Sequence, residues 1–578
     1  MIIWIIILNS NISKKYTEVS NKEFNKRKRS TDDNNTNDNE NNDSDSDIEP
    51  LSQKKIKILN KNKNKEHKIL NILTKDPTNF NQALRTKEAE KWNFAINDEL
   101  NNMYNNKVME IVDKIPTNAN IIDTKWVFTT KDNNIKKARL VAKGFQQIPG
   151  QDFVETYSPT VQADSLRLTV AIAANLNWNL KQLDIKAAYL NAKLDHEIYT
   201  NIPEGDNNYK KKNKYWLLKK ALYGLKQAGR MWFNEISKFL KSTGYIQYKT
   251  DKCLFGKYNK NKKLISLLTL YVDDILITGY DNEINKTIEK LKYKYKISKE
   301  SSANKIIGIN IYKTKNGYKI NQTDYIDKII DRYNMNKTKL IKNPTRKVSE
   351  KEREGSPFVN VQEFKSLLGA LLYIDVKSRP DISFAVNQAS RHCEEPTEVD
   401  YKSLMYILQY LNCTKNKSIY YSRNSEFIGY SDSDFANDET TRKSTSGYIY
   451  LLGDSPISWK TQLQKTVTLS TAEAEFVSLT ECAKQGLWFK NLFKEIFDKE
   501  IKIKIMVDNK ACIAIAQDTN SKGRCKHIDI RYKFIQEKIL ENKIQLEYIN
   551  TEKMLADPLT KSISGINMKI FNDKIFKY

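Results

Sequence analysis

The sequence predicts a multidomain α+β protein that follows a low-complexity N-terminal segment. Its 578 residues are enough for several domains. Short apolar runs typical of strands alternate with longer stretches that have the period of amphipathic helices. Acidic residues stand repeatedly at the ends of these runs, once as an adjacent pair and several times singly in the last third of the chain. Folding can bring such residues together at a few points.

The strongest local signal lies in residues 264–281. Two apolar runs flank Asp273 and Asp274, which predicts two strands joined by a tight turn with two carboxylates at its tip. Adjacent ionised carboxylates repel each other and are costly between apolar strands unless a cation neutralises them. Carboxylate oxygens suit Mg²⁺, and paired Mg²⁺ ions about 3.5–4 Å apart serve in-line phosphoryl displacement. A solvated hairpin turn is the alternative interpretation.

Charge and cysteine content restrict the possible partners and compartment. The net charge is +26 and the pI is about 9.4, which favours a polyanionic partner such as nucleic acid. The six cysteines never form a CxxC motif and the four histidines do not cluster with them, so we expect reduced thiols and no zinc finger or knuckle. These features indicate an intracellular protein.

Residues 1–75 are expected to form a disordered low-complexity segment. Thr31–Pro50 is rich in Asp and Asn and cannot bury a core. The apolar start, residues 1–8, is too short to span a bilayer and lacks the features of a signal peptide, so no membrane partner is expected. The basic run at residues 26–29 is either a nuclear import signal or a chance run of lysine and arginine.

Ordered structure is expected to begin near residue 76 with a helix and a basic hairpin. Apolar residues at helical spacing share one face, and they are Trp92, Ala95, Ile96, Leu100 and Met103. Strands at 126–128 and 138–145 then flank a turn at 131–134. The second strand carries Lys136, Lys137, Arg139 and Lys143. This hairpin either covers a triphosphate, whose charge these cations would offset, or is simply exposed.

A third acid for the adjacent pair is Asp184. A helix at 164–176, capped by Asp164 or Ser165, precedes a strand that places Asp184 between two apolar neighbours. Tyr189, five positions further on, could stack under an incoming sugar and exclude a 2′-hydroxyl, or it could be an ordinary core residue.

The segment 217–233 contains two glycines that interrupt a helical pattern. Gly224 and Gly229 would bring the backbone close to a neighbouring group, with Gln227 and Arg230 facing a nucleotide or template strand. Further on we expect a basic helix at 283–297, a hairpin turning at 316–317 and a polar linker at 340–357. Another buried helix contains Leu367, Leu368, Leu371 and Leu372.

A second group of acids follows residue 427. The pattern predicts an antiparallel meander, a long helix capped by Ser470 or Thr471, a strand followed by a helix, and a last strand followed by a turn. Each element begins or ends near an acid, and these acids are Asp432, Glu475, Asp508 and Asp557. Singly, each is an ordinary surface residue. A sheet with a packed helix can focus them on one point.

Four strings occur in the order and spacing of one known family. "KARLVAKGFQQ", "QLDIKAAYLNA", "KKALYGLKQAGRMWF" and "LYVDDILITG" resemble the reverse transcriptase of Copia-type LTR retrotransposons, although that family often has proline where Gly229 stands. "STAEAEF", "VDNKACIAIA", "KHIDIRY" and "LADPLTK" are similar to the family's ribonuclease H. The resemblance implies a right-hand polymerase of fingers, palm and thumb at 76–340, a linker and connection region at 341–424, a ribonuclease H-like domain at 425–562 and a C-terminal tail at 563–578.

The resemblance also implies site residues, cofactors and partners. Asp184, Asp273 and Asp274 would hold two Mg²⁺ ions, with Mn²⁺ as a substitute, beside the nucleotide-binding residues Lys137, Arg139, Tyr189, Gln227 and Arg230. Asp432, Glu475, Asp508 and Asp557 would hold two more. The partners would be an RNA template, a DNA or RNA primer with tRNA among the candidates, dNTPs and the RNA–DNA hybrid. His527 would assist product release, although relatives often have histidine at the place of Lys533.

Other interpretations are an inactive remnant that only binds nucleic acid, a structural particle protein, and a polymerase without nuclease activity. The sequence does not indicate an oligomeric state. The segment before the first helix is too short for an integrase core, and no Asp-Ser/Thr-Gly protease triplet is present. We therefore expect the C-terminal part of a longer Pol polyprotein, separately encoded or truncated.

Overall fold

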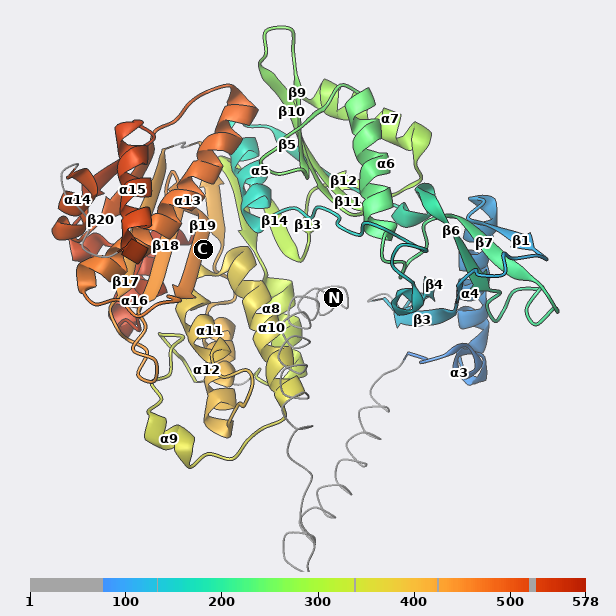
Figure 1. Ribbon diagram of the computed structural model, residues 1–578, viewed down its shortest axis with the longest axis horizontal. Helices are drawn as coiled ribbons and strands as arrows, with labels where there is room; N and C mark the ends of the chain where they lie inside the picture. Colours follow the sequence, from blue (N-terminus) through green and yellow to red (C-terminus); the bar gives the residue numbers. More distant parts are fainter. Residues whose placement is uncertain (1–75, 132–133, 337–338, 424–425, 519–525, 578) are drawn as a thin grey trace, which may run out of the picture. The chain divides into compact units, whose positions relative to one another are not determined.

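A computed structural model describes residues 76–131, 134–336, 339–423, 426–518 and 526–577 (Figure 1). The expectations for the N-terminal 75 residues, including the basic run at 26–29, lie outside this part of the chain. Within the described ranges, none of the helices has both the length and the apolarity needed to cross a membrane.

The first ordered region combines two helices with a four-stranded sheet and a separate two-stranded ribbon. The helices are α3 (Phe80–Arg85) and α4 (Ala89–Asn105). The sheet has the order β1-β7-β6-β2, formed by Met109–Val112, Tyr215–Lys220, Lys193–Asn201 and Ile121–Ile122. The ribbon pairs β3 (Thr124–Thr130) with β4 (Lys136–Ala142). All five apolar residues expected on one face of α4 are buried, which confirms that face.

The second region is a six-stranded antiparallel sheet of order β12-β5-β11-β10-β9-β8. Its strands are β5 (Asn179–Ile185), β8 (Ile246–Gln247), β9 (Leu254–Tyr258), β10 (Leu264–Tyr271), β11 (Asp274–Gly279) and β12 (Ile297–Ser302). Leu180 and Leu276 share one core with α5 (Ala163–Asn175). Leu183 and Ile275 share another with α6 (Ala228–Ser242) and α7 (Asp281–Lys294). Successive side chains along a strand point to opposite faces of the sheet, so apolar residues at neighbouring positions bury both faces.

The cap expected for α5 is wrong. The N-cap residue is Gln162, which makes no side-chain cap bond, and Asp164 lies in the first turn. Asp164 instead pairs with Arg167 and accepts hydrogen bonds from Ser458 and Gln485. A sequence pattern can show that a carboxylate suits a helix N-terminus, but it does not show distant partners that compete for it.

The third region is mainly helical. A small sheet of order β13-β14-β15-β16 consists of Lys305–Ile306, Ile309–Thr314, Gly317–Asn321 and Ile419–Ser422. The helices are α8 (Thr323–Arg332), α9 (Glu350–Glu354), α10 (Val361–Ser378), α11 (Ser383–Ser390) and α12 (Glu398–Thr414). The hairpin at 316–317 and the buried helix of leucines are thus present, and a single short helix, α9, interrupts the stretch expected as a linker.

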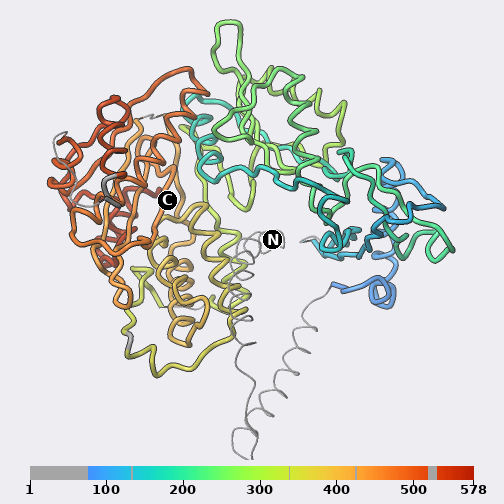
Figure 2. The backbone as a smooth tube through the Cα atoms, viewed as in Figure 1, coloured from blue at the N-terminus to red at the C-terminus, as the bar shows by residue number. Residues whose placement is uncertain are grey.

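The C-terminal region contains a five-stranded mixed sheet of order β19-β18-β17-β20-β21. β17 (Phe427–Asp434), β18 (Thr445–Leu452) and β19 (Ser455–Leu463) are antiparallel, whereas β20 (Ile503–Val507) and β21 (Ile544–Tyr548) run parallel to β17. The long helix α13 (Thr471–Phe497), capped by Ser470 as expected, packs on this sheet. Three further helices follow, α14 (Lys510–Gln517), α15 (Lys526–Leu540) and α16 (Gly565–Ile575). The tube in Figure 2 traces the same path.

Candidate active sites

The first site lies where β10 and β11 meet, beside β5. Asp274 is the direct cross-strand partner of Asp184, so the two side chains leave the same face of the sheet. Asp273 occupies the two-residue turn between β10 and β11, and its carbonyl oxygen accepts a 2.9 Å hydrogen bond from Ile185 N. The structure therefore brings Asp184 next to the adjacent pair Asp273 and Asp274, which lies far along the chain from it.

The turn has an unusual backbone that its surroundings hold in place. Val272 has φ +54°, a left-handed conformation that a β-branched residue rarely adopts. The Val272 carbonyl oxygen accepts a 2.6 Å hydrogen bond from Nε1 of Trp232, a buried residue of α6. Sequence reasoning missed this role, although Trp232 stands inside one of the strings that carry the family resemblance.

The electrostatics of the turn favour a bound cation. Burial is the largest cause that raises the pKa of Asp274, to about 6, and the charge of Asp273 adds to it. The pKa of Asp273 is also raised by burial and by Asp184, whereas Arg139 and Lys137 lower it. Two side-chain donors reach the acids, Gln182 Nε2 at 3.3 Å from Asp274 Oδ1 and the Ser298 hydroxyl on Asp184. A cation would relieve the remaining repulsion.

Three of the expected nucleotide-binding residues lie near these acids. Lys137 and Arg139 lie on β4, and each interacts electrostatically with at least one of the acids. Tyr189 follows β5 and packs against Tyr223, with ring centroids 5.0 Å apart. The charge of Asp273 contributes, after burial, to raising the pKa of Tyr189 to about 12. The Arg139 guanidinium carbon lies 5.5 Å from the Tyr223 ring centroid.

The other two expected residues behave differently. The expectation for Gln227 is wrong, because its side chain is fully buried, donates to Asp152 O at 2.8 Å and accepts from Gln147 Nε2 at 3.0 Å. It supports a protein loop and does not face a ligand. Arg230 lies in α6 and forms an ion pair with Glu155, and its role toward a nucleotide stays a prediction.

Gly224 shows why this loop needs a glycine. Its φ is +92°, and a Cβ there would lie 2.1 Å from the carbonyl oxygen of Ala142, at the end of β4. The expected close approach of the backbone is therefore present, and it joins the loop before α6 to the ribbon that carries Lys137 and Arg139.

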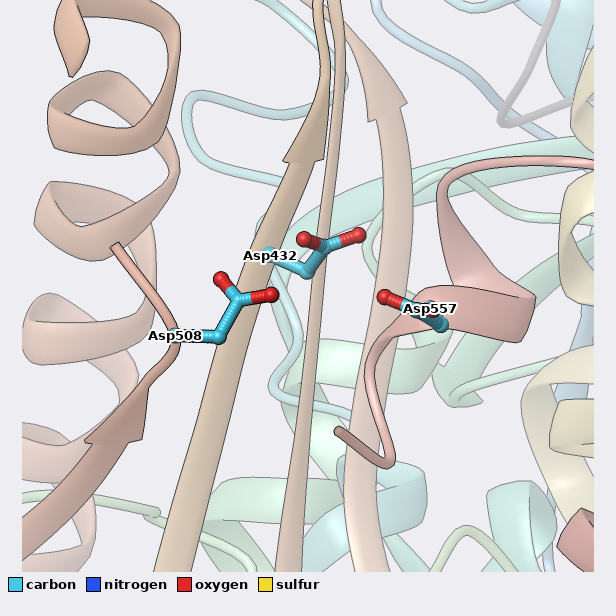
Figure 3. Close-up of side chains that lie close together, drawn as sticks. All are labelled: Asp432, Asp508 and Asp557. Carbon is cyan, nitrogen blue, oxygen red and sulfur yellow. The ribbon is translucent and has the colours of Figure 1, made fainter. Parts of the chain in front are cut away.

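The second site lies at the centre of the C-terminal sheet. Asp432 stands on β17, Asp508 directly follows β20 and Asp557 begins the short 3₁₀ helix Asp557–Leu559 (Figure 3). One carboxylate oxygen from each lies within 4.8 Å of the others. The sequence predicts a strand and then a turn before Asp557, and in the structure Asp557 begins a single 3₁₀ turn with Pro558 near its start, a position that suits proline.

Glu475, the fourth expected ligand, lies near these three acids but outside the group whose oxygens come within 4.8 Å of one another. It lies on α13 with 7% of its surface exposed, and Asp432 and Asp508 add to the effect of burial in raising its pKa. Its Oε1 accepts a 3.3 Å hydrogen bond from Ser433 N, whereas its buried Oε2 has no hydrogen-bond partner. An unpartnered buried carboxylate oxygen is costly, and a cation would satisfy it. Nearby Glu473, by contrast, bonds the backbone N of Leu469 at the start of α13.

Several residues that sequence reasoning missed support this cluster. Lys561 Nζ lies 3.1 Å from Asp557 Oδ1 and 4.0 Å from Asp432 Oδ2. The Thr560 hydroxyl donates to Asp432, and Thr551 Oγ1 donates to Asp508 Oδ2 at 2.8 Å. Thr560 and Lys561 end the string "LADPLTK", so their closeness to Asp557 in the sequence could have indicated that they support the acid cluster.

Because Gly447 has no side chain, the 3₁₀ turn at Asp557–Leu559 can pack directly against β18. It is the cross-strand partner of Asp432, and a Cβ there would lie 2.6 Å from Thr560 Cγ2 and 2.9 Å from Leu559 Cβ. A larger residue on β18 would push the segment that carries Asp557 away from Asp432. His527 falls in α15, where the structure does not describe its side chain, so its role stays a prediction.

The donor sets of both sites fit a hard divalent cation. All of the acidic ligands are carboxylate oxygens, which suit Mg²⁺ or Mn²⁺. At the second site, the unpartnered Oε2 of Glu475 and the raised pKa of buried Asp432 add to this fit. Burial is the largest cause of that shift, and the Asp557 carboxylate contributes.

Comparisons with known proteins agree with this geometry. Residues 106–347 match the family described as reverse transcriptase (RNA-dependent DNA polymerase). The chain is 34% identical over 507 residues to the retrovirus-related Pol polyprotein from transposon TNT 1-94 of Nicotiana tabacum, covering 85% of this chain and 38% of that protein. It is 32% identical to the polyprotein from transposon RE1 of Arabidopsis thaliana, covering 85% and 34%.

The chain thus spans little more than a third of the length of these curated relatives. A solved structure of the foamy viral protease–reverse transcriptase dRH in complex with double-stranded DNA aligns with a TM-score of 0.48 and 12% identity, over 80% of this chain and 70% of that one. Over 85% of its length, the chain is thus similar to the Pol polyproteins of Copia-type retrotransposons, and its residues 106–347 match the reverse transcriptase family.

Proposed function

We propose that this chain is an RNA-directed DNA polymerase that also degrades the RNA of its RNA–DNA hybrid. The observation that carries the first activity is the pairing of Asp184 with Asp274 across two strands, with Asp273 in the adjoining turn. The second activity rests on the oxygens of Asp432, Asp508 and Asp557, which lie within 4.8 Å of one another.

In the first site, the three acids would hold two Mg²⁺ ions between a primer end and a dNTP. Bound Mg²⁺ activates the attacking hydroxyl and neutralises charge on the transferring phosphoryl group. Lys137 and Arg139 on β4 would offset the charge of the triphosphate. Tyr189 would form the floor under the sugar and exclude a 2′-hydroxyl, thus selecting deoxynucleotides by shape.

In the second site, Asp432, Glu475, Asp508 and Asp557 would hold the ions that position a water against the RNA strand. Thr560 and Thr551 fix the orientation of two of these carboxylates through their hydroxyl donors. The net charge of +26 supports a nucleic-acid partner in general, and an A-like hybrid is recognised through its backbone shape.

Two single substitutions in the purified chain test this proposal. Incorporation of dNTP on a primed RNA template and cleavage of labelled RNA in a hybrid are measured with Mg²⁺. Asp273→Asn should reduce synthesis at least 100-fold and leave cleavage intact, and Asp508→Asn should do the reverse, because each removes a ligand from one site only. Asp331→Asn and Asp454→Asn, at exposed positions, are the matched controls.

Each failure has its own meaning. A wild-type chain that cleaves RNA but does not incorporate dNTP would be an inactive remnant of a polymerase. Synthesis without any RNA cleavage would identify a polymerase whose C-terminal site is idle. If Asp273→Asn and Asp508→Asn leave both activities unchanged, the proposed sites are wrong.

A further inference from the structure

Helix α5 of the polymerase part is fastened to the C-terminal region by a buried arginine. Arg167 has 2% of its surface exposed. Its Nε donates to Ile457 O on β19 at 2.8 Å, and its Nη1 donates to Val376 O and Lys377 O on α10 at 2.6 and 3.0 Å. Its guanidinium carbon also lies 3.9 Å from the Trp459 ring centroid. One side chain therefore joins three regions of the fold.

The ion-pair partner of this arginine extends the junction. Asp164, one turn earlier on α5, pairs with Arg167 Nη2 through Oδ1. Its Oδ2 accepts hydrogen bonds from Ser458 Oγ at 2.7 Å and from Gln485 Nε2 at 2.9 Å. Both carboxylate oxygens are thus satisfied, one within α5 and the other by β19 and α13.

A second junction lies near the C-terminal end of α13. The carboxylate of Glu495 accepts from the backbone N of Lys249 at 2.8 Å and from Thr250 Oγ1 at 2.9 Å. Tyr258 on β9 donates its hydroxyl to Glu495 O at 2.9 Å. Apolar residues of α5 and of the C-terminal sheet also belong to one continuous core.

These contacts make separation of the two parts costly. Pulling β19 from α5 would break the hydrogen bonds that join Arg167 to Ile457 and Asp164 to Ser458, and it would expose to water the apolar surface that the two parts share. Parts of a chain are expected to move relative to each other unless the interface is large and apolar. Here a shared apolar core and buried charges both resist motion.

We propose that Arg167 and Asp164 are positioning residues that hold the C-terminal acids at one fixed distance from the polymerase acids. This inference rests on the proposed function. Its consequence is that RNA is cut at one narrow distance behind the primer terminus, because the same rigid body holds both sites.

The test measures where the RNA is cut. A hybrid is used whose primer ends in a chain-terminating nucleotide, and the incoming dNTP anchors that end in the polymerase site. The wild-type chain should give cuts within a few neighbouring positions. Arg167→Lys keeps the positive charge but loses the planar guanidinium, which donates to Ile457, Val376 and Lys377 at once. Because the junction would then be looser, the range of positions at which the RNA is cut should become at least three times as wide. For Arg167→Lys, the rate of synthesis on a short template should stay within twofold of the wild-type rate. Its total cleavage of a hybrid that is not anchored by a dNTP should also stay within twofold of wild type.

Matched variants separate positioning from general damage. Arg353→Lys weakens an arginine–aspartate pair confined to the region of α9 and α12, and it should leave the cut positions unchanged. Gln485→Leu removes one donor to Asp164 and serves as the milder variant if Arg167→Lys does not fold. Hydrogen exchange of the α5 amides should be slow in the wild-type chain and faster in both junction variants.

Three results would overturn the inference. Unchanged cut positions in variants whose α5 amides exchange faster would show that the junction forms but does not set the distance. Fast exchange of α5 in the wild-type chain would show that the junction itself is absent. A wild-type chain with neither activity would refute the proposed function and the positioning role together, while the exchange measurement would still report on the junction.

Discussion

Asp375 is a buried carboxyl group outside both sites, and it gives the stability of the folded chain a pH dependence. Its oxygens accept from Trp459 Nε1 and Ser383 Oγ, each at 3.3 Å. Burial raises its pKa to about 7. Between about pH 4 and 7 the unfolded chain releases this proton while the folded chain keeps it, so stability falls as the pH rises.

Asparagine at this position has no proton to lose. Asp375→Asn should therefore raise the free energy of unfolding by about 2–4 kcal/mol at pH 8 and change it little at pH 4. Urea unfolding midpoints at the two pH values measure this difference. Asp331→Asn, on an exposed side chain, is the control. A variant that is less stable than wild type at pH 8 would contradict the prediction.

Lys561 neutralises part of the second acid cluster in the metal-free protein. Its ammonium group lies 3.1 Å from Asp557 and 4.0 Å from Asp432, in the space between two of the expected metal ligands. Because like charges compete, Lys561→Met should raise the affinity of this site for Mn²⁺ about three- to tenfold.

Calorimetric titration of Mn²⁺ measures this affinity. The chain used should also carry Asp273→Asn and Asp274→Asn, so that only the second site binds. Lys569→Met, at an exposed position of α16, controls for the loss of a surface charge. Lower affinity in Lys561→Met would mean that the lysine helps to build the site and does not compete with the metal.

At the scale of the elements, the 3₁₀ turn that carries Asp557 depends on the missing side chain of Gly447. A Cβ would collide with Thr560 and Leu559, which leave no space toward β18. Gly447→Ala should therefore displace Asp557 and reduce RNA cleavage at least tenfold, with DNA synthesis unchanged. Gly369→Ala, in α10 where nothing lies within 4 Å of the added atom, is the control. Full cleavage by Gly447→Ala would show that the turn can move without loss of the site.

The sequence predicts elements better than it predicts their supporting contacts. The strands that carry Asp184 and Asp432 follow from local apolar patterns, and the structure has both. The burial of Gln227 and the partners of Asp164 depend on residues far along the chain, and no local pattern encodes them. Supporting residues such as Trp232 and Gly447 become visible only when register and packing are known.

For the whole molecule, the structure describes two groups of buried or half-buried acids within one compact unit, each group beside a different apolar core. Each group is strained by its own charge when no metal is bound, since burial raises the pKa of Asp274 in one and of Asp432 in the other. A ligand that binds only the folded state stabilises it by mass action, by about 2.7 kcal/mol at 100 times its dissociation constant. Binding of a metal ion to either group of acids should therefore raise the free energy of unfolding.

We predict that MgCl₂ raises the unfolding temperature of the wild-type chain and that excess EDTA reverses the rise. Asp273→Asn and Asp508→Asn should each lose part of the rise, because each removes one ligand from one group, and the double variant should lose nearly all of it. Thermal unfolding followed by circular dichroism, with CaCl₂ at equal ionic strength as a comparison for metal size, measures these shifts. An equal rise in the wild-type chain and the double variant would place the stabilising Mg²⁺ elsewhere, and neither acid group could then be its site.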